Sequence, residues 1–331
     1  MKIKIAIVGY GNVGKAIEKQ AYSSGEFEIA GIFTRREGVK SPLGTRVFKQ
    51  SALLDAGFCG EIDVCMLAVG SAFDLQTTSL KLAARYNTVD SFDTHAKMKE
   101  YIASLDDVCK KCGTLSLVGC GWDPGIFSLE RAILAEIVQG SIPQTFWGKG
   151  VSQGHSEAIR RIKGVKYAIQ YTIPNVQAIN EAREGRTDFT PREKHLRECF
   201  VVADYSSLCA DPQDESKEKS ALERRIREQI VNMPDYFKDY DTTVHFVSEE
   251  EFLKNHQAAY HGGEVIASSK GGECRAQFSV SMKSNPDFTA GIMLAYARAN
   301  YQMKSAGETG AKTVLDVPVR YLLKGDGLKF V

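Results

Sequence analysis

The segment Gly9-Tyr-Gly11-Asn-Val-Gly14 has the G-x-G-x-x-G spacing of turns that bind the pyrophosphate of a dinucleotide. An apolar run, residues 3–8, precedes it and a helical pattern, residues 13–22, follows it, as this chemistry requires. Gly9 allows a tight turn, Gly11 admits a phosphate close to the backbone, and Gly14 lets the helix pack on the strand. The free N–H groups at the start of the helix would bind the phosphates. The alternative is a purely structural turn, and the context favours cofactor contacts from the whole turn, including Tyr10, Asn12 and Val13.

The end of the second predicted strand, residues 27–33, indicates which cofactor binds. NAD-binding chains usually carry Asp or Glu about 20 residues beyond the glycine turn, where the carboxylate binds the ribose 2′-hydroxyl. Here the strand continues into Thr34-Arg35-Arg36. A carboxylate would repel a 2′-phosphate, whereas a hydroxyl and a pair of guanidinium groups would bind it through charge-assisted hydrogen bonds. The alternative is a basic surface loop, but the position favours NADP(H).

A later turn, Val69-Gly70-Ser71-Ala72, ends the strand predicted over residues 63–69. Ligands of doubly wound sheets lie beyond the carboxyl ends of the strands. We therefore expect this turn to border the ribose or the nicotinamide of the cofactor. Ser71 would also suit the N-cap of the helix predicted over residues 75–86, and the two roles are compatible.

Two acidic turns follow strands on the same side of the predicted sheet. Asp93 follows a short extended segment, residues 87–90, and Asp123 lies in Gly121-Trp122-Asp123-Pro124-Gly125 after the strand predicted over residues 114–119. Proline restricts the backbone of the residue before it, so the Asp123 carboxylate can be aimed. Asp-Pro-Gly is also common in plain turns. A pair of carboxylates near a nicotinamide could hold a substrate ammonium, direct its C–H toward the ring and accept a proton.

The elements that must position these residues change character along the chain. Up to about residue 120, buried strands alternate with amphipathic helices (residues 75–86 and 98–111 among them), which predicts a parallel sheet and a Rossmann dinucleotide-binding domain. Residues 121–285 carry strands that often alternate apolar and polar positions, which predicts a second α+β domain for substrate binding and dimerisation, built on a largely antiparallel sheet. The helix predicted over residues 288–303 and the strand-like residues 313–317 would return, so that residues 286–331 complete the first domain. The strands predicted in the second domain are residues 145–147, 165–172, 199–203, 243–247, 264–268 and 274–283.

The composition excludes several classes of protein. The 331 residues include 42 Lys and Arg against 41 Asp and Glu, so neither nucleic acid nor an anionic membrane surface is an expected partner. The charged residues 211–228 form a solvated helix face, with Leu222, Ile226 and Ile230 directed inward. The chain has no apolar run of membrane-spanning length, and its first residues lack the long apolar core of a signal peptide.

The 8 cysteines show no disulfide framework. Cys109-Lys-Lys-Cys112 is a lone CxxC without a second pair to complete a zinc site, so we expect reduced thiols and no metal. Reduced cysteines predict a cytoplasmic protein.

Together with the glycine turn, Thr34-Arg35-Arg36 and the acidic turns, several longer strings resemble the meso-diaminopimelate D-dehydrogenase family. The resemblance runs from the first predicted strand to the last helix. Ala68-Val69 and Phe73 depart from the family pattern, which could alter the grip on the cofactor but not the reaction. The strings are Phe146-Trp147-Gly148, Ser152-Gln-Gly-His-Ser156, Met233-Pro-Asp-Tyr-Phe237, His261-Gly-Gly263 and Asn285-Pro-Asp-Phe-Thr289.

The resemblance implies NADP-dependent, reversible oxidative deamination at the D-centre of meso-2,6-diaminopimelate. The products would be L-2-amino-6-oxopimelate, ammonia and NADPH, in lysine and diaminopimelate biosynthesis, and the protein would be a homodimer. Asp93 and Asp123 would bind the D-centre amine and act in catalysis, although the sequence does not say which of them takes the proton. The resemblance places Trp122, Trp147, Ser152, Gln153 and Gly154 near the D-centre, and Thr172, Arg197, His261 and Asn285 at the distal L-centre.

The assignments at the L-centre agree with elementary chemistry. A carboxylate at the far end of the substrate needs a fixed cation, and a guanidinium such as that of Arg197 offers a planar fork for it. Without the resemblance, Arg197 would be interpreted as a surface cation on a strand, and His261 as a polar loop histidine.

Two other functions fit the same pattern. One is an NADP-dependent reductase of another amino or keto acid on this scaffold. The other is a non-catalytic NADPH sensor, which would not need a pair of aimed carboxylates together with an arginine in the second domain.

Overall fold

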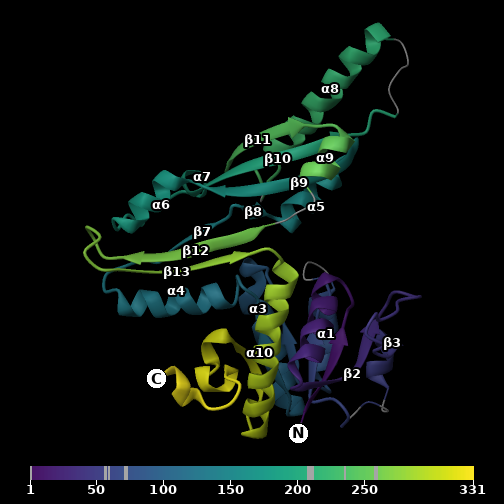
Figure 1. Ribbon diagram of the computed structural model, residues 1–331, viewed down its shortest axis with the longest axis vertical. Helices are drawn as coiled ribbons and strands as arrows, with labels where there is room; N and C mark the ends of the chain where they lie inside the picture. Colours follow the sequence, from purple (N-terminus) through teal and green to yellow (C-terminus); the bar gives the residue numbers. More distant parts are fainter. Residues whose placement is uncertain are drawn as a thin grey trace. The chain divides into compact units, whose positions relative to one another are not determined.

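The computed structural model describes residues 2–55, 58, 60–70, 74–206, 212–234, 236–256 and 260–331, with the backbone alone at residues 96, 153 and 212–215. The chain forms two compact units. One comprises Met1–Leu129 with Pro286–Val331, and the other comprises Glu130–Asn285. Many of the helices and strands are labelled in Figure 1.

The first unit is built on a parallel sheet, which confirms the predicted Rossmann fold. In the described part of the chain this sheet has seven strands in the order β14-β6-β5-β4-β1-β2-β3. The strand order turns away from β1 in both directions, so β1 and β4 lie at the switch point where dinucleotides bind in such sheets. The strands are β1 (Ile3–Val8), β2 (Phe27–Thr34), β3 (Val47–Lys49), β4 (Val64–Leu67), β5 (Thr88–Asp90), β6 (Leu115–Val118) and β14 (Gly310–Thr313).

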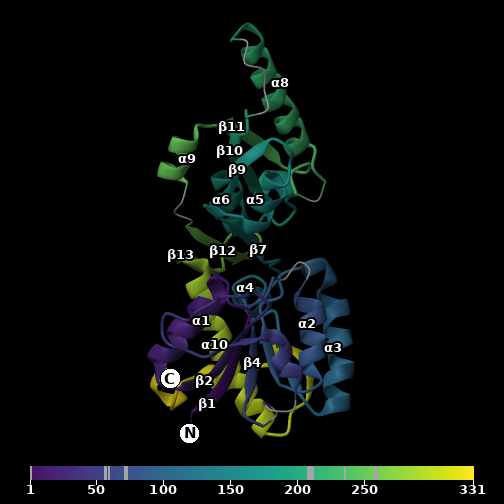
Figure 2. The same ribbon diagram turned by 90° about the vertical axis from the view of Figure 1, so that its right-hand side faces the viewer.

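Helices cover both faces of this sheet because alternate strand residues point to opposite sides. On β1, Ile5 and Ile7 join the core under α1 (Asn12–Ser24) and α10 (Asn285–Ser305). Val8 joins the core under α2 (Leu75–Ala83) and α3 (Met98–Cys112). Figure 2 shows the α2–α3 pair on one side of the sheet and α1 on the other.

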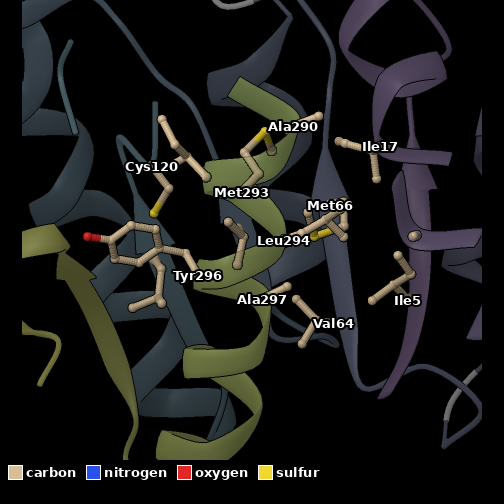
Figure 3. Close-up of a cluster of buried hydrophobic side chains, with 14 of the residues drawn as sticks. Ile5, Ile17, Val64, Met66, Cys120, Ala290, Met293, Leu294, Tyr296 and Ala297 are labelled. Carbon is tan, nitrogen blue, oxygen red and sulfur yellow. The ribbon is translucent and has the colours of Figure 1, made fainter. Parts of the chain in front are cut away.

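Helix α10 extends the first unit with residues from the far end of the chain. Met293, Leu294 and Ala297 lie beside Val64 and Met66 of β4 (Figure 3). Burial of these side chains is the main force that holds the helix there. Farther along α10, the Asn300 amide donates to the carbonyl oxygens of Thr88 and Leu115, both at 3.1 Å, and so joins the helix to β5 and β6.

One predicted strand lies earlier in the chain than expected. Residues 313–317 were predicted to be strand-like, but β14 ends at Thr313. The Thr313 side chain accepts from the Leu315 amide, and Asp316 accepts from the Thr313 amide at 2.7 Å. This capping box closes the chain into a 3-10 turn (Val314–Asp316) instead.

The second unit contains two sheets, and its predicted antiparallel character is confirmed with one exception. The described residues form a four-stranded sheet, β11-β10-β9-β8, and a three-stranded sheet, β13-β12-β7. All the pairs are antiparallel except β10 with β11, which is parallel because α8 crosses over between them. The strands are β7 (Gln144–Trp147), β8 (Gly150–Val151), β9 (Val165–Pro174), β10 (His195–Ala203), β11 (Asp241–Phe246), β12 (His261–Ser268) and β13 (Arg275–Met282).

The charged stretch predicted as a solvated helix face is α8 (Pro212–Val231). Leu222, Ile226 and Ile230 are buried against Phe237 and the β10 core, as predicted. No helix of the described ranges has the length and apolar character needed to cross a membrane. The other helices are α4 (Ile126–Ile137), α5 (Gln153–Arg160), α6 (Val176–Arg183), α7 (Pro191–Lys194) and α9 (Glu249–Asn255), and further 3-10 turns are η1 (Gln50–Leu54), η3 (His95–Lys97), η5 (Val319–Leu322) and η6 (Gly327–Phe330).

Candidate active site

The glycine turn lies between β1 and α1, and its glycines differ in what they accommodate. A Cβ on Gly9 would lie 2.6 Å from the Ala68 carbonyl oxygen, and a Cβ on Gly14 would lie 2.3 Å from that of Gly9. The protein's own packing therefore requires glycine at both positions. A Cβ on Gly11 would meet no protein atom within 4 Å, and Gly11 is the N-cap residue of α1. The open space at Gly11 lies where a pyrophosphate would approach the helix N-terminus, so the turn fits a dinucleotide.

The remaining residues of the turn contribute in different ways. Tyr10 is 2% exposed, and its hydroxyl bonds to Glu18 inside the core. Burial, reinforced by Glu18, raises the pKa of Tyr10 to about 12. Its side chain is therefore a structural anchor, and a ligand contact would come from its backbone amide. Asn12 is exposed and Val13 half-buried at the start of α1.

The predicted phosphate-binding arginines lie at the carboxyl end of β2 and are exposed. Thr34 is buried, and its hydroxyl accepts from the Arg36 amide at 3.2 Å. Arg36 donates to the Tyr10 carbonyl oxygen, which joins this loop to the glycine turn. Arg35 donates to both carboxylate oxygens of Asp74, at 2.9 and 2.5 Å. The β2 loop thus presents two guanidinium groups, one of which already has an anionic partner.

A hollow of about 390 Å³ lies beside the Arg35–Asp74 pair. Asp74 is the N-cap residue of α2, and its amide donates to the Gly70 carbonyl oxygen. Val69 and Gly70 follow β4 as predicted, whereas Ser71 and Ala72 lie outside the described residues. Asp74 was not predicted as a site residue, although an acid directly before a predicted helix is a common N-cap signal. Side chains around the hollow include Arg35, Gln50, Ser51, Asp74, Thr78 and Lys81.

Asp93 and Asp123 follow the carboxyl ends of β5 and β6, which are neighbouring parallel strands. Asp93 is exposed and Asp123 half-buried. The Asp123 turn is closed on itself, because the Gly121 amide donates to the Pro124 carbonyl oxygen and a Cβ on Gly125 would lie 1.8 Å from the Gly121 oxygen. Both acidic turns therefore lie at one edge of the sheet, in the same unit as the glycine turn.

Trp122 belongs to the packed side of the Asp123 turn. Its ring meets that of Phe127 edge-on, with centroids 5.3 Å apart. It is half-buried and packs against the core shared by β1 and α10. Because the ring is fixed on one side, the direction of the neighbouring Asp123 backbone is also fixed.

In the second unit, Trp147 ends β7 and is held by a histidine that sequence analysis left unassigned. The Trp147 amide donates to Nε2 of His195 at 2.9 Å, and the two rings stack with centroids 5.2 Å apart. Burial, with the charges of Arg197 and Lys194, lowers the pKa of His195 to about 3. The ring is neutral near pH 7 with its proton on Nδ1. The sequence did contain a signal for His195. It lies two residues before Arg197 in a strand, so the two side chains share one face of β10.

Arg197 is a buried cation with no anionic partner among the described residues. It is 5% exposed, and no carboxylate of the described residues forms an ion pair with it. Its guanidinium lies 4.0 Å from the Tyr240 ring centroid and donates to the Thr172 hydroxyl. Within the ranges that the structure describes, its Nε has no hydrogen-bond partner. Burial lowers the pKa of Arg197. An isolated buried charge is costly, so this site is suited to an anion.

The Thr172 hydroxyl is available to donate to the same anion as Arg197. Arg197 lies directly opposite Thr172 in the β9–β10 register. The Thr172 hydroxyl oxygen also accepts from the side-chain amide of Gln170, at 3.3 Å. With two donors directed at its oxygen, Thr172 retains its own hydroxyl proton for an acceptor. Gln170 and Tyr240, neither predicted, complete this group.

Ser152 precedes α5 and bonds to a second neutral histidine. The Ser152 hydroxyl lies 2.7 Å from Nδ1 of His155, and Nε2 of His155 lies 3.1 Å from the Tyr236 carbonyl oxygen. A carbonyl only accepts, so Nε2 carries the proton and Ser152 donates to Nδ1. Burial, with the Arg197 charge, lowers the pKa of His155 to about 4. The Ser152 oxygen therefore keeps its lone pairs for a donor. Gln153 and Gly154 form the first turn of α5.

His261 and Asn285 lie at the ends of elements. His261 begins β12, is 7% exposed, and has its pKa lowered by burial. A Cβ on Gly150 would lie 3.1 Å from the His261 Cα, which places β8 close beside it. Asn285 begins α10 and is half-buried. Within the second unit the structure therefore brings Thr172 and Arg197 into direct contact and places Gly150, two residues before Ser152, beside His261.

Comparison with known proteins agrees with this arrangement. The pattern of the diaminopimelic acid dehydrogenase C-terminal domain matches residues 121–284. Meso-diaminopimelate D-dehydrogenase of Acetivibrio thermocellus is 45% identical, over 97% of this chain and 94% of that protein. Diaminopimelate dehydrogenase of Corynebacterium glutamicum in complex with diaminopimelate matches with a TM-score of 0.88 and 36% identity, over 99% and 98% of the two chains. An engineered D-amino acid dehydrogenase bound to NADP⁺ matches with a TM-score of 0.84 and 35% identity, over 100% and 98%.

The Rossmann sheet, the glycine turn and the adjacent acidic turns define an oxidoreductase of the dinucleotide-binding class. Within this class, sequence identity to known proteins over nearly the whole chain indicates one family of amino-acid dehydrogenases. The chain belongs to the meso-diaminopimelate D-dehydrogenase family, which confirms the resemblance inferred from the sequence strings.

Proposed function

We propose that this protein catalyses the reversible, NADP-dependent oxidative deamination of meso-2,6-diaminopimelate at its D-centre. The products are L-2-amino-6-oxopimelate, ammonia and NADPH. The observation that carries the proposal is the buried Arg197, which has no anionic partner among the described residues and therefore suits the carboxylate of a zwitterionic substrate.

The L-centre of the substrate would bind to the second unit. A carboxylate there would accept from the Arg197 guanidinium and from the Thr172 hydroxyl, whose oxygen is already occupied by two donors. His261 and Asn285 are further contacts for this end of the substrate. Because Arg197 is fixed by Thr172 and Tyr240, little side-chain entropy is lost when the carboxylate binds.

The D-centre would bind to the acidic turns. Asp93 and Asp123 would hold the ammonium group, with Trp122, Trp147 and the Ser152–Gly154 segment shaping the site. The Ser152 oxygen, which donates its proton to His155, suits an N–H donor of the substrate. Bound NADP⁺ would supply the acceptor for the hydride of the D-centre carbon, and water would add to the resulting imine with release of ammonia. The Asp93 and Asp123 carboxylates are the candidates to take up the proton that the amine loses.

NADP(H) is the cofactor we propose, with contacts from the glycine turn, Thr34, Arg35, Arg36 and the Val69–Ala72 turn. The exposed guanidinium groups at the end of β2 and the absence of an acid at that position support a 2′-phosphate. The similar engineered D-amino acid dehydrogenase was bound to NADP⁺.

We also propose a cytoplasmic homodimer that acts in lysine and diaminopimelate biosynthesis, with residues 121–285 as the substrate-binding and dimerisation domain. Exposed apolar side chains in this region, among them Ile137 and Ile142 at 61% each, support an interface. The free, buried thiols of Cys65, Cys109, Cys120 and Cys199 support a reducing compartment. Light scattering of the purified protein would test the dimer.

The reaction is tested by incubating the protein with NADP⁺ and each of meso-, LL- and DD-diaminopimelate while NADPH absorbance is followed. We expect NADPH with the meso isomer. Turnover only with another amino acid would favour a different substrate on the same scaffold. Silence with every isomer despite tight NADPH binding would favour a sensor and refute the proposal.

A further inference from the structure

Asp90, the last residue of β5, is a buried carboxyl group that joins the two acidic turns. It is 0% exposed. Its Oδ1 accepts from the Phe92 amide at 2.9 Å and from the Gly119 amide at 3.1 Å. Its backbone oxygen accepts from the Cys120 amide at 2.7 Å. Phe92 immediately precedes Asp93, and Gly119 begins the turn that carries Asp123, so one side chain holds the starts of both turns.

The other oxygen of Asp90 ends a chain of hydroxyl groups. Tyr101 lies 2.7 Å from Oδ2 of Asp90 and 2.8 Å from the Ser79 hydroxyl. Ser79 in turn lies 2.7 Å from the Leu75 carbonyl oxygen. A carbonyl only accepts, so Ser79 donates to Leu75, Tyr101 donates to Ser79, and the remaining link needs a proton on Asp90. If Asp90 were ionised, only the two hydroxyl protons of Ser79 and Tyr101 would be available for these three contacts. One buried contact would then have no proton.

A neutral Asp90 also agrees with its surroundings. Burial is the largest effect on the pKa of Asp90 and raises it, while the contacts of its carboxyl group with Phe92, Tyr101 and Gly119 act in the opposite direction. In a neutral carboxyl group Oδ1 accepts and Oδ2 donates, as the oxygen and nitrogen of an asparagine amide do, although asparagine carries one more N–H. The geometry therefore predicts that asparagine can replace this residue.

We infer that Asp90 is a positioning residue, held as a neutral acid, that sets the placement of Asp93 and Asp123 relative to each other. The inference rests on the proposed function, in which those carboxylates bind the D-centre amine. Asp90 reaches the substrate only through the turns that it holds. Removing it would free the Phe92 and Gly119 amides while leaving the glycine turn and the β2 arginines unchanged.

Three variants separate this role from simple stabilisation. We expect Asp90→Ala to lower kcat/KM for meso-diaminopimelate about 10- to 100-fold, because small misplacements of reacting groups are costly. NADPH affinity should not change. Asp90→Asn should restore kcat/KM to nearly the wild-type value with an unchanged pH profile. Tyr101→Phe, which removes the partner of Oδ2 and of Ser79 but leaves both hydrogen bonds to Oδ1, should lower the unfolding temperature but leave kcat/KM intact.

Each outcome bears on a separate claim. A wild-type protein without diaminopimelate activity refutes the proposed function. An active wild type with an equally active, folded Asp90→Ala variant refutes the positioning role, as does an Asp90→Asn variant that loses as much activity as Asp90→Ala. A Tyr101→Phe variant that loses activity to the same extent also overturns it, because the effect would then follow stability. Should Asp90→Ala not fold, Asp90→Ser takes its place, since its hydroxyl is too short to hold both amides.

Discussion

Arg35 and Arg197 both suit anions, but their surroundings are opposite. The Arg35 side chain is 62% exposed and pairs with Asp74, whereas Arg197 is 5% exposed and has no carboxylate partner in the described part of the chain. Water and salt weaken an exposed pair, so Arg35 can exchange one anion for another at small cost. Arg197 has given up most of its hydration, and no described carboxylate supplies a counter-charge.

This difference separates cofactor selection from substrate recognition. An exposed cation distinguishes ligands by modest free energies and releases them readily. A buried, uncompensated cation favours the ligand that supplies the missing charge, and it lowers the stability of the free protein. We therefore expect substitution of Arg197, in the second unit, to change ligand binding and stability more than substitution of Arg35.

The largest effect is expected for Arg197→Met. Loss of one partner of a buried charge pair costs about 2–5 kcal/mol, which corresponds to a fall in kcat/KM for diaminopimelate of about 30-fold to a few thousand-fold. The ligand-free protein should unfold at an equal or higher temperature, because an unpaired buried charge has been replaced by an apolar chain. Steady-state kinetics and thermal unfolding check the two effects.

Arg192→Met is the matched control for Arg197. Arg192 belongs to the same unit, and its side chain is 56% exposed. Neither kinetics nor unfolding temperature should change appreciably. An Arg197→Met variant with normal kcat/KM and lower stability would show that Arg197 is structural, and the contrast with Arg35 would be lost.

Acid should destabilise the second unit before the first. Burial lowers the pKa of His155 to about 4 and that of His195 to about 3, below the ordinary value of about 6.5. As the pH falls below about 6.5 the unfolded chain takes up protons that the folded unit refuses, so stability falls by up to about 1.4 kcal/mol per pH unit for each histidine. The loss continues until the folded pKa values are reached.

The chain provides its own reporters for this difference, since it has 2 tryptophans. Trp122 packs in the core of the first unit, and Trp147 stacks on His195 in the second. Fluorescence of Trp122→Phe reports on Trp147, and that of Trp147→Phe reports on Trp122. We expect the Trp147 signal to change at the higher pH. Coincident transitions would mean that the units do not differ in acid stability.

The two regions also differed in how far the sequence predicted them. The glycine turn and the arginines after β2 depend on local backbone geometry and on neighbours along the chain, so their spacing was informative. Trp147 is held by His195 and Arg197 by Tyr240, and these partners come from another strand and from a distant turn. Contacts of this kind depend on strand register, which one sequence does not specify. Asp90 was missed because its role appears only when neighbouring strands are aligned.

A smaller effect is expected for cofactor choice. Arg35→Asp combined with Arg36→Ala removes the charge-assisted hydrogen bonds to a 2′-phosphate, which in this exposed position are worth about 1.5–3 kcal/mol together. NADP⁺ affinity should fall about 10- to 100-fold while NAD⁺ affinity stays close to that of the wild type. Titration calorimetry with both cofactors measures this. Arg85→Ala, an exposed cation beyond the far end of α2, is the control. Equal losses for both cofactors would contradict the phosphate assignment.

The smallest effect, and the most direct test of how readily Arg35 exchanges partners, is expected for Asp74→Asn. The Arg35–Asp74 pair must open or be shared when a phosphate binds, and an exposed pair of this kind is worth about 0.2–1 kcal/mol. Removing the carboxylate should therefore tighten NADP⁺ binding about 1.5- to 5-fold without affecting NAD⁺. Glu37→Gln, on the same loop but paired with Lys49, should change neither affinity. Weaker NADP⁺ binding by Asp74→Asn would mean that Asp74 orients Arg35 for the phosphate. Arg35 would then be a pre-formed group like Arg197, because its position, and not its freedom, would determine selectivity.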